Sequence, residues 1–149
     1  MGLFDKLAQA VTTPQEKANY NSLLNAAGIS IPDVKFSMEN GILTVTGQVP
    51  DGATAESAVA ALKKAPGVSD VKNYLVVEDL TSRRIMMKVV TKSSNLNIRK
   101  GPGTNYDIIG KAAHNSQVQL IKKMYNGWYY IKSENGTEGF CSTDYLAQI

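Results

Sequence analysis

Residues 34–49 of the chain read VKFSMENGILTVTGQV, and this stretch decides the fold of the N-terminal half. Apolar residues alternate with polar ones on both sides of Asn40-Gly41, as they do in two half-buried strands. The dipeptide Asn-Gly favours a tight type I′ turn, because both central residues of that turn need a positive φ. We therefore expect a β-hairpin here.

Helical patterns lie on both sides of this hairpin. Residues 13–16, Thr-Pro-Gln-Glu, are typical of a capped helix start, and Gly28 predicts its end. Between them, apolar residues recur at helical spacing, at Tyr20, Leu23, Leu24 and Ala27. A second apolar stripe follows residues 50–52, at Ala55, Ala58, Val59 and Leu62, and residues 68–77 predict a third strand. The economical packing is an αββαβ sandwich, a three-stranded sheet with both helices on one face.

Residues 15–79 resemble the BON domain (bacterial OsmY and nodulation). The resemblance rests on the alternating strand with its Asn-Gly turn, the pattern V-x-G-x-V at residues 45–49 and G-V-x-x-V-x-N at residues 67–73. It implies a small αββαβ binding module without catalysis, for which phospholipid or envelope association has been proposed. Residues 1–14 then form a lead segment.

The C-terminal half has a different pattern. Short strand-like runs near residues 87–91, 96–98, 118–122, 128–131 and 139–141 are separated by turn signals such as Gly101-Pro102-Gly103 and Asn126-Gly127. Five short strands at this spacing predict an all-β small barrel over residues 85–149, after a short linker at residues 80–84. The whole chain is therefore expected to be α+β followed by all-β.

Three motifs in this half resemble the bacterial Src-homology-3 domain. They are L-N-I-R-x-G-P-G-T-x-Y-x-x-I-G at residues 96–110, N-G-W-Y-Y-I at residues 126–131 and G-x-x-G-F-C-S-T-D-Y-L at residues 136–146. The resemblance implies a binding module; many members bind cell-wall peptides or accompany wall hydrolases. Cys141 stands where the family usually has an apolar strand residue, which indicates a buried thiol.

The candidate ligand-binding residues are Arg99, Tyr106, Trp128, Tyr130 and Tyr145. Strand parity places Trp128 and Tyr130 on one face and the core residue Ile131 on the other. If they are partly exposed, the aromatic rings would line a groove for a peptide or a glycan stem. The alternative is that they pack in the interior of the barrel. Arg99 would either bind a carboxylate or hydrogen-bond to turn carbonyls, and we favour the second.

The sequence offers no constellation for catalysis. Its one histidine, His114, lies in a turn-like stretch and is expected to be exposed, and its one cysteine is expected to be buried. No triad, carboxylate pair or phosphate loop stands at a meaningful spacing, so we expect no catalytic residues and no enzyme. Side-chain motifs cannot reveal a potassium site, because potassium prefers backbone carbonyl oxygens.

The charge of the chain is unevenly distributed. Of 149 residues with a net charge of +3, residues 1–80 carry six lysines against nine acids, and the remainder carries ten basic and four acidic residues. The lysine pairs at 63–64 and 122–123 are interpreted as solvated edges, and no nucleic-acid partner is expected. No apolar run is long enough for a membrane span and no secretory signal is evident, which favours a cytoplasmic location and leaves peripheral envelope association open.

These observations predict a non-enzymatic two-domain binding or adaptor protein. Its expected partner is a cell-envelope or peptidoglycan-type peptide or another protein. The alternative is a cytoplasmic potassium-binding sensor or stress-response protein. That alternative rests on the opening Met1-Gly2-Leu3-Phe4 with a BON domain, a plan similar to the small cytoplasmic BON–LysM potassium-binding proteins, with the LysM domain replaced. Potassium would then be the cofactor; otherwise none is expected.

Overall fold

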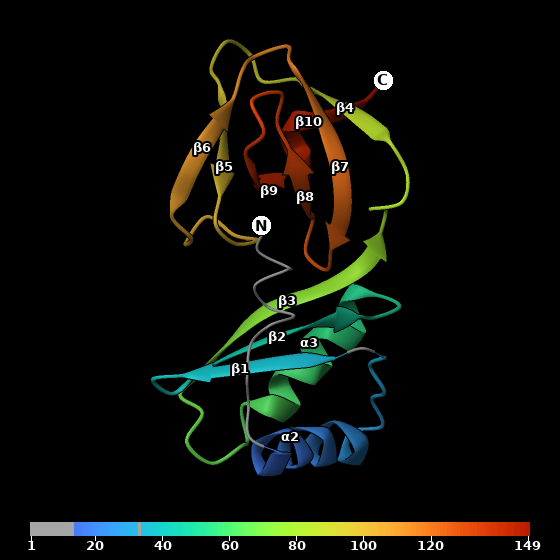
Figure 1. Ribbon diagram of the computed structural model, residues 1–149, viewed down its shortest axis with the longest axis vertical. Coiled ribbons are helices and arrows are strands. Elements are labelled where there is room, and N and C mark those ends of the chain that lie inside the picture. Colours follow the sequence, from blue (N-terminus) through green and yellow to red (C-terminus); the bar gives the residue numbers. More distant parts are fainter. Residues whose placement is uncertain (1–13, 33) are drawn as a thin grey trace. The chain divides into compact units, whose positions relative to one another are not determined.

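The structure is a computed structural model that describes residues 14–32 and 34–149. Most of the predicted lead segment at residues 1–14 and the predicted helix cap at Thr13 therefore lie outside the described residues. The chain divides into two compact units between Val77 and Glu78. We call them the N-terminal unit and the C-terminal unit and describe each by itself (Figure 1).

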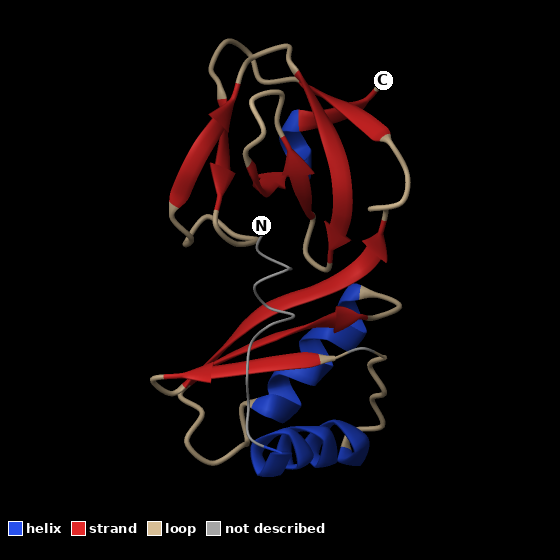
Figure 2. Ribbon diagram, viewed as in Figure 1, coloured by secondary structure: helices blue, strands red, loops and turns tan. Residues whose placement is uncertain are grey.

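The N-terminal unit has the predicted order of helix, strand, strand, helix and strand. Its elements are α2 (Pro14–Ala26), β1 (Lys35–Glu39), β2 (Ile42–Gln48), α3 (Gly52–Leu62) and β3 (Asp70–Asp79). β2 lies between the other two strands, antiparallel to β1 and parallel to β3, and α3 provides the crossover that a parallel pair needs. Both helices lie on the same face of these strands (Figure 2).

The hairpin predicted at Asn40-Gly41 is confirmed. Both residues have a positive φ, 52° and 80°, as a type I′ turn requires. The alternation then buries Phe36, Leu43 and Val45. The Tyr20 ring from α2 covers this face, with its centroid 5.0 Å from that of Phe36.

The ends of the two helices follow from local hydrogen bonding. Gly28 ends α2 with a φ of 75°, and the N–H of Ile29 donates to the carbonyl oxygen of Leu24 at 2.9 Å. At the start of α3, the carboxylate of Asp51 accepts a hydrogen bond of 2.8 Å from the N–H of Thr54. The predicted α3 stripe is largely buried, at Ala55, Ala58 and Leu62, whereas Ala27 of the α2 stripe is exposed.

The C-terminal unit is described in full and holds seven strands. They are β4 (Ile85–Val89), β5 (Leu96–Arg99), β6 (Ile108–Ala112), β7 (Gln117–Met124), β8 (Trp128–Lys132), β9 (Glu138–Ser142) and β10 (Leu146–Gln148), with the 3-10 helix η1 (Thr143–Tyr145) before the last. The pairings β10-β4-β7-β8-β9-β5-β6 are all antiparallel. Every strand contributes to one core, whose fully buried members include Val89, Ile98, Val118, Ile131 and Cys141.

Two of these strands exceed the five that the sequence pattern predicts. β6 shows no alternation, because Ile108 and Ile109 are both exposed, 47% and 48%. β10 is three residues long and exists through its pairing with β4. The α+β character of the chain is confirmed, and among the described residues no helix combines the length and apolar character of a membrane span.

The segment predicted as a linker, residues 80–84, begins with a core residue. Leu80 is 4% exposed and belongs to the core of the C-terminal unit. Its N–H donates to the carbonyl oxygen of Ile121 in β7 at 2.7 Å. The first residues of the C-terminal unit are thus bound to β7 before β4 begins.

The lysine pair in β7 is not a fully solvated edge. Lys122 Nζ lies 3.0 Å from the carboxylate of Asp79, and its side chain is only 13% exposed. Lys123 Nζ lies 3.4 Å from the carboxylate of Glu78. The prediction is therefore wrong for Lys122, because an acidic partner more than 40 positions earlier in the chain lies beside it.

Candidate functional site

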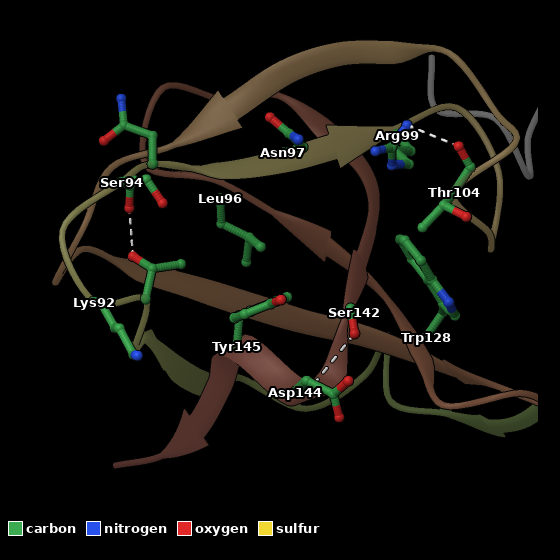
Figure 3. Close-up of a pocket in the computed structure, with 12 residues that line it drawn as sticks. Lys92, Ser94, Leu96, Asn97, Arg99, Thr104, Trp128, Ser142, Asp144 and Tyr145 are labelled. Atoms are coloured by element: carbon green, nitrogen blue, oxygen red, sulfur yellow. Dashed lines mark hydrogen bonds between the residues drawn. The ribbon is translucent and has the colours of Figure 1, made fainter.

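A pocket of about 720 Å³ lies within the C-terminal unit, beside β5 (Figure 3). One wall is the loop between β4 and β5, with the polar residues Thr91, Lys92, Ser94 and Asn95. Leu96, Asn97 and Arg99 of β5 form the next part, followed by Thr104. The remaining wall comes from the start of β8 and from η1 with the residue before it. The pocket therefore gathers residues from four separate stretches of the unit: residues 91–99, Thr104, Trp128 and residues 142–145.

The 3-10 helix η1 places Asp144 and Tyr145 in the pocket wall. Ser142 caps this helix, since its hydroxyl oxygen accepts a hydrogen bond from the N–H of Asp144 at 3.3 Å. At the other end, the N–H of Val90 donates to the carbonyl oxygen of Tyr145 at 2.8 Å. The phenol ring remains accessible, with Tyr145 48% exposed. Both ends of η1 are held, so the carboxylate and the ring are presented from a defined backbone.

Trp128 provides the second aromatic side chain of the wall. It is the first residue of β8, pairs in register with Ser142 of β9, and is half-buried. Figure 3 shows its indole beside Arg99 and Thr104, with Tyr145 farther along the pocket. Of the five residues predicted to bind ligand, the structure brings three into one pocket: Arg99, Trp128 and Tyr145.

Arg99 hydrogen-bonds to turn carbonyls, the favoured of its two interpretations. Its Nη1 donates to the carbonyl oxygens of Thr104 at 3.1 Å and Tyr106 at 2.9 Å. The N–H of Lys100 donates to the carbonyl oxygen of Asp107 at 2.8 Å, which closes the base of the same loop. Arg99 thus holds the loop that carries Thr104 into the pocket wall.

The other two predicted residues do not line the pocket. The Tyr106 ring lies against Gly101, where a Cβ would come within 2.3 Å of Tyr106 Cδ1. Tyr130 is 2% exposed, its ring centroid lies 4.9 Å from that of Phe140, and its hydroxyl donates to a carboxylate oxygen of Glu138 at 3.4 Å. The expectation that Tyr130 is partly exposed is therefore wrong, because its ring packs against Phe140 although Trp128, on the same face of the strand, is half-buried.

Cys141 and His114 have structural environments. The Cys141 thiol is fully buried, burial raises its pKa to about 12, and its Sγ donates to the carbonyl oxygen of Asn97 at 3.5 Å. His114 is half-buried, not exposed as predicted: its Nδ1 lies 3.1 Å from the Thr91 hydroxyl oxygen, and its N–H donates to the Asn95 side-chain oxygen at 3.2 Å. In the described residues, no three His, Cys, Asp or Glu side chains form a metal-binding group.

Several residues of the pocket were not predicted from the sequence. Lys92 and Asp144 are its charged side chains besides Arg99, and Asn97 and Ser142 add polar groups. From the sequence alone, Asp144 is interpreted as one of the acidic residues in the loops of the barrel. The one local signal is Ser142, two positions before it, which has the residue type and spacing of a helix cap.

Two protein families match separate parts of the chain. Residues 15–79 match the family described as BON domain, and residues 94–147 match the family described as Bacterial SH3 domain. The second match contains all the pocket residues except Thr91 and Lys92, which precede it.

Similar proteins are much longer than the matched part of this chain. A curated relative from Bacillus subtilis (strain 168), "Putative N-acetylmuramoyl-L-alanine amidase YrvJ", is 38% identical over 58 residues, which are 39% of this chain and 11% of the relative. The "Structure of NlpC2 from Trichomonas vaginalis" and the "Structure of NlpC1 from Trichomonas vaginalis" are each 25% identical, with TM-scores of 0.39 and 0.37. They cover 45% and 43% of this chain, which spans 24% and 22% of theirs. With both family matches in place, the chain is a BON domain followed by a bacterial SH3 domain.

Proposed function

We propose that this protein is a non-enzymatic binding protein whose SH3 domain recognises a peptidoglycan-type peptide in the pocket beside β5. The observation that carries the proposal is the pocket itself. It combines two accessible aromatic rings, Trp128 and Tyr145, with polar and charged side chains from the loop between β4 and β5, from β5, from Thr104 and from the stretch 142–144. Mostly preformed concave sites with a few convergent polar groups are typical of ligand-binding modules.

The comparisons support the class of ligand. The relative from Bacillus subtilis is named a putative N-acetylmuramoyl-L-alanine amidase, and that name refers to a muramoyl sugar joined to L-alanine. The present chain spans 11% of that relative, so we propose that it shares a recognition module and not the catalytic part.

The environments of Cys141 and His114 favour binding over catalysis. A nucleophilic cysteine needs a lowered pKa and an accessible sulfur, whereas the Cys141 thiol is buried and its pKa is raised to about 12. The His114 ring lies against the Thr91 hydroxyl, so its position supports the loop wall of the pocket. We therefore assign neither residue a chemical step.

The finer architecture and the location belong to the same proposal. We propose that the N-terminal unit is the two-layer αββαβ sandwich of BON domains and that the C-terminal unit is the small barrel of SH3 domains. We propose a cytoplasmic protein, with peripheral envelope association as the alternative. Fractionation of the native cells, followed by immunodetection, would distinguish the two locations.

The pocket is tested by sedimentation with purified insoluble peptidoglycan. We expect Trp128→Ala and Tyr145→Ala to weaken retention at least tenfold, because each removes an aromatic contact surface. Ile109→Ala is the matched control, since Ile109 is as exposed as Tyr145, both 48%, and lies outside the pocket. Equal retention of all three variants, each folded by circular dichroism, would reject the pocket as the binding site.

The potassium alternative is tested by thermal melting in KCl against NaCl at equal ionic strength. A ligand that binds only the folded state raises the melting temperature in proportion to the logarithm of its concentration. A selective rise in KCl together with no peptidoglycan retention would replace the proposal by the alternative.

A further inference from the structure

The pocket contains two opposite charges that do not pair with each other or with a neighbour. Lys92 and Asp144 both line it and are both exposed. The ion pairs within the described residues join Lys122 to Asp79 and Lys123 to Glu78, away from the pocket. An ammonium and a carboxylate therefore face the same cavity with their charges uncompensated.

Asp144 lines the same pocket as two aromatic side chains. In Figure 3, Asp144 lies below the Trp128 indole and the Tyr145 ring, and Lys92 lies beyond Tyr145 toward the other end of the pocket. The backbone agrees with this view, because Asp144 directly precedes Tyr145 and follows Ser142, the register partner of Trp128, by two residues. A cation bound by Asp144 would thus share the pocket with the Trp128 and Tyr145 rings, and aromatic rings attract cations through their quadrupole.

Lys92 is a better candidate than Arg99 for binding an anion in the pocket. The Arg99 Nη1 is bound to the carbonyl oxygens of Thr104 and Tyr106, and that contact orders the loop. Lys92, in the loop between β4 and β5, has no such contact among the described residues. Its long side chain is exposed and lines the pocket. An ammonium of this kind acts as a point charge for a carboxylate.

We propose that the pocket selects peptides that carry both a free side-chain ammonium and a carboxylate. This inference rests on the proposed function and names its ligand class: stem peptides with a basic diamino acid residue. The ammonium binds Asp144 in the pocket that Trp128 and Tyr145 also line, and a carboxylate binds Lys92. A neutral peptide of the same shape would leave both protein charges partly desolvated and unpaired, so specificity comes from the cost of the wrong ligand as well as the gain from the right one.

The probe is the synthetic peptide N-acetyl-L-alanyl-γ-D-glutamyl-L-lysyl-D-alanine, titrated into the full chain by calorimetry. A second form carries an acetyl group on the lysine Nε, and a third has its carboxylates amidated. We expect each modification to weaken binding to the native protein about tenfold. Asp144→Asn should abolish the effect of Nε-acetylation, and Lys92→Gln should abolish the effect of amidation, each to within twofold.

Controls separate local from general charge effects. Asp107→Asn and Lys88→Gln remove like charges from the same unit outside the pocket and should preserve both preferences. Asp144→Glu keeps the charge and should retain the preference for the free ammonium.

The outcomes distinguish the inference from the proposed function. If the native protein binds all three peptide forms equally, or if Asp144→Asn still discriminates against the acetylated form, the charge-selection inference is overturned while the binding function stands. If none of the three forms binds and the protein is not retained by insoluble peptidoglycan, the proposed function itself fails.

Discussion

At the scale of single residues, the burial of Cys141 makes the stability of the fold depend on pH. Its thiol is fully buried in the core of the C-terminal unit, and burial raises its pKa from an ordinary 9.0 to about 12. In this range the folded protein keeps a proton that the unfolded chain releases. Stability is therefore expected to fall as pH rises from about 9 toward 12.

This titration can be measured with a Cys141→Ala variant. Between pH 8 and pH 10.5, the unfolding free energy from urea titrations should fall by about 2 kcal/mol more in the native protein than in the variant, because each tenfold change in proton concentration contributes about 1.4 kcal/mol there. The constant cost of the lost side chain cancels, as do lysines and tyrosines common to both proteins. Identical pH dependence in the two proteins would contradict a buried, protonated thiol.

The role of a residue could be predicted from the sequence where its contact partners lie a few positions away in the chain. Arg99 binds carbonyls five and seven positions ahead, within its own loop, and such a contact is readable from the motif. Tyr130 shows the limit of strand parity, which predicts a face and not its exposure: Tyr130 and Trp128 share a face, yet Tyr130 is buried while Trp128 is half-buried. The place of Asp144 in the pocket could not be predicted, because the rest of the lining comes from residues 91–99, Thr104 and Trp128, which are distant in sequence.

At the scale of elements, the start of α3 depends on one carboxylate. The hydrogen bond from the N–H of Thr54 holds the pKa of Asp51 below its ordinary value. A lowered pKa means that the carboxylate stabilises the fold above the unfolded value of 3.8 and that this stabilisation is lost as pH falls through the folded pKa.

We expect Asp51→Ala to lower the urea midpoint, followed by far-UV circular dichroism, at pH 7. The difference from the native protein should narrow at pH 2, where the native carboxylate is protonated. Asp51→Asn, which still caps, should lie near the native midpoint at both pH values. Glu56→Ala removes an exposed acid of the same helix and serves as the control; a loss as large as that of Asp51→Ala would refute the cap.

Elements with their own local chemistry were predictable, and elements that depend on distant pairing were not. The Asn40-Gly41 hairpin was predicted from neighbouring residues. The cap at Asp51 was not predicted, although it is equally local, since it needs only the N–H of Thr54. β10 and η1 depend on more than neighbouring residues: β10 is three residues long and pairs with β4, and η1 is held by Ser142 and by Val90. Of the pocket wall that η1 forms, the sequence predicted the aromatic residue Tyr145 but neither the helix itself nor Asp144.

At the scale of the whole molecule, the C-terminal unit begins at Glu78, seven residues before its strand β4. Leu80 lies in its core, and Asp79 pairs with Lys122 of β7. We expect a fragment of residues 78–149 to be more stable than a fragment of residues 85–149, since burying one leucine is worth about 2 kcal/mol.

In the full chain, Leu80→Ala should cost about 2–3 kcal/mol in unfolding free energy of the C-terminal unit, and Ser82→Ala, at an exposed position of the same segment, should cost little. Equal stability of the two fragments, together with no loss of stability in Leu80→Ala, would support the prediction that residues 80–84 are a linker. Denaturant midpoints by circular dichroism decide between the two results.

Trp128 is the only tryptophan in the sequence, and it stands in the pocket wall half-buried. Its intrinsic fluorescence therefore reports directly on the SH3 domain. A ligand that covers the indole would shift its emission to the blue and shield it from iodide. The protein thus carries its own label-free optical reporter of pocket occupancy.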